Sequence, residues 1–131
     1  MDYSLDYFLE KNWSFILIKN GRIVYKSKLQ GLKPLIFCIK KYKKEMRGAI
    51  IFDKIIGRAA AILLAFAKVK EVWTPIISRS GKAYLTKNKM KITYKNLASC
   101  ITNRKGDDTC PMEKMSLKMP EKEFIAKMLK Q

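Results

Sequence analysis

The chain has 131 residues and is 48% hydrophobic, which suits one domain with its own core and excludes a wholly disordered protein. Its formal net charge is +17, from 28 Lys and Arg residues against 11 Asp and Glu residues, so anionic partners are favoured. With three cysteines and no histidine, neither a disulfide framework nor a Cys/His zinc site is expected.

No targeting segment is expected. The first six residues are acidic where a signal peptide would be basic. The longest apolar run, 59–67, is much shorter than the roughly 18 residues of a membrane span. The sequence therefore predicts a single cytoplasmic domain over 1–131 with no membrane partner.

Hydrophobic periodicity predicts strands that alternate with helices. In chain order we expect a helix at 2–10, strands at 15–18 and 23–25, a helix from 31–34, a strand at 48–52, a helix at 57–68, a strand at 71–74, a loop at 75–80, a helix at 82–87, a strand at 90–94, a helical turn at 96–100, a loop at 103–109, a helix from 110–111 and a last helix at 121–130. Asn20-Gly21 is typical of a two-residue hairpin turn. The order predicts an α/β fold in three layers, α/β/α, around a mixed sheet that begins with a β-hairpin.

Polar residues mark the ends of two predicted parallel strands. Asp53 and Lys54 follow one strand, and Thr74 ends the next. Ligands of open α/β sheets bind beyond such carboxyl ends. Asp53 is therefore a candidate general base or nucleophile, and the alternative is that it caps the helix that follows.

Gly57 and Arg58 begin the helix between these strands. Gly57 lets a ligand approach the backbone, the first N–H groups form an anion site, and Arg58 could hold a phosphate. The alternative is a close-packed helix start with one solvated arginine.

Cys110, Pro111 and Glu113 form the start of a later helix. Their spacing predicts a capping box, with Cys110 at the N-cap, Pro111 at the first position and Glu113 at the third. Because a thiol at a helix N-terminus ionises more readily, Cys110 is a candidate nucleophile, and a purely structural cap is the alternative. Cys38 and Cys100 lie in apolar settings and are expected in the core.

Several segments together resemble a small prokaryotic family that is classed as a domain of unknown function with the cytidine-deaminase-like fold. They are SFILIKNGRIVYKSK, GLKPL, IIFDKIIGRAAA, TPIIS and ITNRKGDDTCPMEK. The resemblance implies a deaminase-like core over about 14–117, with peripheral helices at 1–12 and 119–131.

Deaminases of this fold hold zinc with a His/Cys-x-Glu at one helix start and Pro-Cys-x-x-Cys at another. At the helix starts that we compare, this sequence has Gly57-Arg58-Ala59 and Cys110-Pro111-Met112-Glu113. The resemblance therefore implies the pocket without its metal, and we expect neither a cofactor nor zinc-dependent deamination.

The leading functional hypothesis is binding of a nucleotide or a similar phosphate-bearing small molecule. The expected site comprises Asp53, Lys54, Gly57, Arg58, Thr74, Asn103, Arg104, Cys110 and Glu113. Catalysis through Asp53 or Cys110 stays open, with no reaction named. The alternatives are a basic nucleic-acid-binding module and a protein-interaction module with a vestigial pocket, and fold relatives suggest a homo-oligomer.

Overall fold

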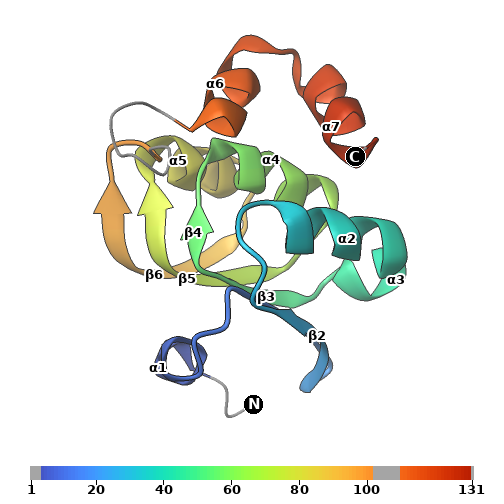
Figure 1. Ribbon diagram of the computed structural model, residues 1–131, viewed down its shortest axis with the longest axis vertical. Helices are drawn as coiled ribbons and strands as arrows, with labels where there is room; N and C mark the ends of the chain where they lie inside the picture. Colours follow the sequence, from blue (N-terminus) through green and yellow to red (C-terminus); the bar gives the residue numbers. More distant parts are fainter. Residues whose placement is uncertain (1–3, 102–109, 131) are drawn as a thin grey trace.

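The computed structural model describes residues 4–101 and 110–130, which form seven helices and six strands (Figure 1). The helices are α1 (Leu5–Glu10), α2 (Lys33–Lys41), α3 (Lys43–Met46), α4 (Arg58–Phe66), α5 (Arg79–Lys87), α6 (Pro111–Lys118) and α7 (Glu121–Leu129). The strands are β1 (Phe15–Lys19), β2 (Arg22–Ser27), β3 (Ile50–Asp53), β4 (Ile55–Ile56), β5 (Glu71–Ser78) and β6 (Lys91–Ala98). No helix in these described ranges is long and apolar enough to cross a membrane.

All six strands belong to one mixed sheet. The hairpin of β1 and β2 is antiparallel, β1 pairs antiparallel with β3, and β5 pairs parallel with β3, β4 and β6. Asn20 and Gly21 have φ angles of 52° and 76°, which confirms the predicted hairpin turn. The mixed sheet that begins with a hairpin is therefore as expected.

Strand β4 continues β3 after a short break. β6 pairs with β5 along its length, so β3 and β4 share the opposite side of β5, and both keep the same register. The break lies opposite Pro75, which has no backbone N–H to donate. The Lys54 N–H donates to the Ser14 carbonyl on the β1 side, at 3.0 Å. A carbonyl facing Pro75 would receive no hydrogen bond from it, so an interruption of the strand pairing suits this position.

Two sequence predictions near this break are wrong. The segment 75–80 was expected to be a loop, but β5 continues through Pro75 to Ser78. The segment 96–100 was expected to form a helical turn, but β6 extends to Ala98 and pairs Asn96 with Ile76. In both cases tertiary pairing with a neighbouring strand outweighed the local preference of the residues.

Helices cover the two faces of the sheet unequally. In Figure 1, α1 lies alone below the sheet, whereas the other helices lie above it. The smaller core cluster joins Leu5 and Phe8 of α1 to Ile16, Ile18 and Phe52. The larger cluster fills the space between the opposite face and α2, α4 and α5. The candidate site lies on this larger side.

Helices α6 and α7 pack on α4 and complete the larger core. Phe124 and Met128 of α7 are fully buried in it. Burying a side chain of this size contributes roughly 1.5–3 kcal/mol, so α7 adds to the stability of the larger core. Six of the nine residues of α4 are buried. The sheet covers one side of α4, and helices α6 and α7 cover the other.

Candidate functional site

The start of α4 is occupied by a carboxylate from α6. Glu113 is only 7% exposed. Its Oε2 accepts a hydrogen bond from the Arg58 backbone N–H at 2.9 Å, and its Oε1 accepts one from the Ala59 N–H at 2.8 Å. Charge-assisted bonds of this kind, aligned with the helix dipole, are stronger than neutral ones. Glu113 thus satisfies the backbone donors that the sequence suggested would bind a ligand.

Gly57 lets this carboxylate come close. A Cβ atom on Gly57 would lie 2.5 Å from the carboxyl carbon of Glu113. A Cβ on Gly81, in the first turn of α5, would lie 2.9 Å from the Gly57 carbonyl carbon and oxygen. The starts of α4 and α5 and the side chain of Glu113 therefore form one contact that leaves no room for additional side-chain atoms.

The Arg58 side chain is fixed by packing. Its guanidinium lies 5.3 Å from the ring centre of Tyr84, and its Nε donates to the Ser116 carbonyl at 3.4 Å. The Tyr84 hydroxyl donates to Glu121. Desolvation, followed by this hydrogen bond, raises the pKa of Tyr84 to about 12. Arg58 therefore links α4 to α5 and α6. The sequence had suggested either that Arg58 binds a phosphate or that its side chain is solvated, and this packed arrangement is neither.

The predicted capping box at α6 is wrong. Cys110 does occupy the N-cap and Pro111 the first helical position, as expected, but the Cys110 side chain makes no capping hydrogen bond. Glu113 cannot reach back to the N-cap because its carboxylate is bonded to α4. Glu113, at the third position of α6, therefore caps the start of α4 instead of the start of its own helix.

Asp53 and Thr74 lie next to each other inside the sheet. The register that pairs Phe52 with Trp73 places them opposite one another, and both are buried. The Thr74 hydroxyl already donates to the Ile76 carbonyl at 2.9 Å. Lys54, by contrast, is exposed. The structure brings the two predicted strand-end residues together but covers them.

Burial raises the pKa of the Asp53 carboxyl well above its usual range, although hydrogen bonds with the backbone of Lys54 and Ile55 oppose the effect. The folded protein therefore holds this proton more tightly than the unfolded chain does. The contribution of Asp53 to stability is largest below about pH 4 and is lost as pH rises through its folded pKa.

Asp53→Asn should therefore stabilise the protein at pH 8 by about 1–3 kcal/mol more than it does at pH 4, since Asn carries no charge to bury. Urea unfolding at the two pH values measures this difference. Glu123→Gln, on an exposed part of α7, is the control. It should not change the difference between the free energies of unfolding at pH 8 and pH 4. An equal effect of Asp53→Asn at both pH values would contradict a raised pKa of the Asp53 carboxyl.

The remaining predicted residues are only partly placed. Asn103 and Arg104 lie outside the described residues. Cys110 is half-buried and Cys38 is buried, with its pKa raised to about 12 by desolvation, whereas Cys100 is exposed rather than in the core. Across residues 4–101 and 110–130, no three His, Cys, Asp or Glu side chains gather closely enough to hold a metal ion.

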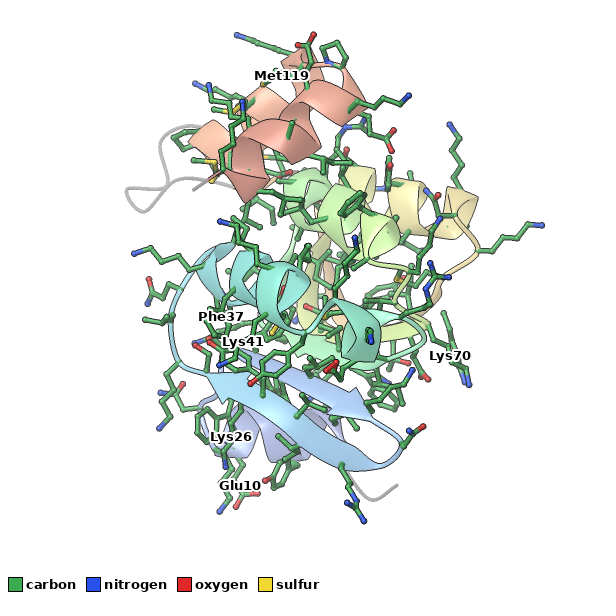
Figure 2. The ribbon with its side chains drawn as sticks, turned by 90° about the vertical axis from the view of Figure 1, so that its right-hand side faces the viewer. Glu10, Lys26, Phe37, Lys41, Lys70 and Met119 are labelled. Atoms are coloured by element: carbon green, nitrogen blue, oxygen red, sulfur yellow. The ribbon has the colours of Figure 1, made fainter. Side chains whose placement is uncertain are left out.

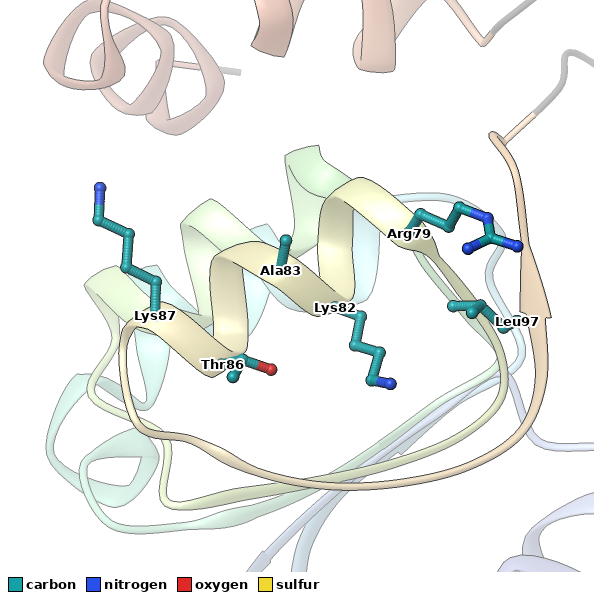
Figure 3. A pocket seen from close by; sticks show the side chains of 6 residues that line it. All are labelled: Arg79, Lys82, Ala83, Thr86, Lys87 and Leu97. Carbon is teal, nitrogen blue, oxygen red and sulfur yellow. The ribbon is translucent and has the colours of Figure 1, made fainter.

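A basic groove that the sequence analysis missed runs along α5 (Figure 3). It is shallow and widely open to solvent, has a volume of about 530 Å³, and is lined by Arg79, Lys82, Ala83, Thr86, Lys87 and Leu97. Five of these residues follow helical spacing on α5, a periodicity that could have identified the basic face. In Figure 3, Arg79 reaches towards Leu97 of β6, Lys82 also points to the β6 side, and Lys87 points away.

Lys82 also contacts an aromatic side chain of β6. Its ammonium donates to the Tyr94 hydroxyl at 3.1 Å and lies 5.0 Å from the centre of the ring. The lining of the groove contains cations and no acid, whereas the α4 start holds the Glu113 carboxylate. An anion is therefore attracted to the groove and repelled at the α4 start.

Comparison with known proteins identifies a family. A family model described as a domain of unknown function, DUF1893, matches residues 4–131. The chain is similar to the crystal structure of a DUF1893 family protein from Thermotoga maritima, with 27% identity and a TM-score of 0.85. The match covers 96% of this chain and 85% of that one. No curated protein matches the chain.

Proposed function

Because the chain belongs to the DUF1893 family, whose function is unknown, we propose from its own residues that it binds a nucleotide or a similar phosphate-bearing small molecule in the groove between α5 and β6. Arg79 and Lys82 hold the phosphate groups. The observation that carries this proposal is the lining of the groove, which has cations and no carboxylate. Arg79 supplies a guanidinium fork and Lys82 a point charge, and both suit phosphate oxygens.

The electrostatics of the α4 start support the choice of the groove. A phosphate at that position would have to displace Glu113 from two backbone N–H groups and would meet its negative charge at short range. No such competitor lines the groove. The ligand hypothesis drawn from the sequence is therefore kept, and its site moves from Gly57 and Arg58 to the neighbouring helix.

The cytidine-deaminase-like fold, without zinc, belongs to the same proposal. An antiparallel hairpin at one edge of a mixed sheet whose later strands run parallel supports that fold. The residues do not fit zinc chemistry, because the sequence has no histidine and the Glu113 carboxylate is already bonded to α4. Since fold does not fix function, we assign no catalytic step.

Nucleotide binding to single variants tests the proposal. Calorimetric titration with adenosine mono-, di- and triphosphate should give affinities that rise with phosphate count. The Arg79→Glu and Lys82→Glu variants should each lose at least about tenfold in affinity, because a like charge replaces an attractive one. Lys118→Glu, an equal charge change at the end of α6, is the matched control and should lose much less.

Arg58→Ala separates the two sites. If the groove binds the nucleotide, this variant keeps the native affinity, because Arg58 is packed on Tyr84 away from the groove lining. Loss of binding in Arg58→Ala with native binding in Lys82→Glu would return the site to α4. Absence of any nucleotide binding at low salt would overturn the proposed function itself.

A further inference from the structure

Three aromatic rings form a half-exposed cluster where β2 meets α2, which we call the aromatic platform: Tyr25, Phe37 and Tyr42. The ring centres of Tyr25 and Phe37 are 5.1 Å apart, and Tyr42 lies 6.1 Å from Tyr25 and 6.2 Å from Phe37. Phe37 is 41% exposed. A phenylalanine this open, within a cluster of rings rather than alone, offers a flat apolar surface to a partner.

One lysine lies over the aromatic platform, and others are exposed on the same helix. The Lys41 ammonium lies 5.6 Å from the ring centres of both Phe37 and Tyr42, and Figure 2 shows Phe37 and Lys41 close together beside the hairpin. Lys33 and Lys40 are also exposed on α2. Residues 11–44 contain ten Lys and Arg residues and no Asp or Glu, so this part of the chain is strongly cationic. The partner that complements this surface is therefore anionic as well as aromatic.

We infer that the aromatic platform binds single-stranded nucleic acid. Unpaired bases stack on Phe37 and its neighbours, and the phosphates that link them pair with Lys41 and the other lysines of α2. Stacking on exposed rings needs bases that a duplex keeps covered, so single strands are preferred. Lysines neutralise the phosphate backbone without reading the bases, so the binding depends little on sequence. This surface is separate from the α5–β6 groove, and the inference does not rest on nucleotide binding there.

Fluorescence anisotropy with labelled single-stranded oligonucleotides of uridine or thymidine, about twelve residues long, tests the inference, with a duplex of equal length for comparison. The native protein should bind both single strands at 50 mM salt and the duplex more weakly. Phe37→Ala should weaken single-strand binding about tenfold, and Phe37→Trp should restore it. Phe66→Ala is the matched control, since Phe66 is also 41% exposed but lies outside the aromatic platform, and it should bind as the native protein does.

Salt dependence gives an independent readout. Lys41→Ala should reduce the slope of log affinity against log salt by about 0.7, the value for one phosphate contact with a single strand. Thermal melting checks that Phe37→Ala remains folded, as expected for an exposed side chain. Equal losses in Phe37→Ala and Phe66→Ala, tighter binding to the duplex, or no oligonucleotide binding at 50 mM salt would each overturn the inference.

Discussion

Gly57→Ala is expected to lower the free energy of unfolding by about 3 kcal/mol, because the added methyl group and the Glu113 carboxylate cannot share the same space. The Cβ would lie 2.5 Å from the carboxyl carbon. Glu113 would have to withdraw and give up its bonds to the Arg58 and Ala59 N–H groups, which are 2.9 and 2.8 Å long. Urea unfolding measures the change.

A double-mutant cycle identifies the cause. Gly57 has φ −102° and ψ −170°, extended backbone that alanine also adopts, so the substitution carries no backbone strain of its own. Glu113→Ala alone should cost about 2–4 kcal/mol, since it leaves two N–H groups unsatisfied. In that background, Gly57→Ala should cost less than about 0.5 kcal/mol. Additive costs would show that the two residues do not interact.

The order of helices and strands could be predicted from local sequence patterns, because tertiary contacts do not change it. The Asn20-Gly21 turn fixes the hairpin, and the apolar run at 48–52 predicts a covered strand because it lacks polar alternation. The extents of β5 and β6 could not be predicted in the same way. Locally, Pro75 signals a loop and the residues from Asn96 a helical turn, whereas the chain pairs there because a neighbouring strand lies alongside.

The candidate site shows where one sequence stops being informative. The donors at the start of α4 and the acidic residue of α6 were both identified, and each had a plausible local role. Their pairing joins residues 55 positions apart in the chain, and it depends on α6 packing over α4, which no local pattern encodes. The basic face of α5 was a periodic signal open to detection, but it becomes a groove only because β6 lies beside it.

Gly81→Ala should destabilise the protein by about 2–3 kcal/mol, although Gly81 lies inside a helix where alanine is normally the better residue by about 1 kcal/mol. The Cβ would meet the Gly57 carbonyl carbon and oxygen at 2.9 Å and the Ile56 carbonyl oxygen at 3.1 Å. These are backbone atoms, so no side-chain rotation relieves the clash. Any shift of Gly57 also disturbs the hydrogen bonds that Glu113 makes at the start of α4.

Thr86→Ala is the matched control for this substitution. Thr86 is exposed on the same helix, so alanine there should leave the stability unchanged or raise it slightly through helix propensity. Opposite signs for the two alanine substitutions, measured by urea unfolding, would assign the cost at Gly81 to the contact between α4 and α5. If Gly81→Ala were as stable as Thr86→Ala, the starts of α4 and α5 would be farther apart than the structure places them.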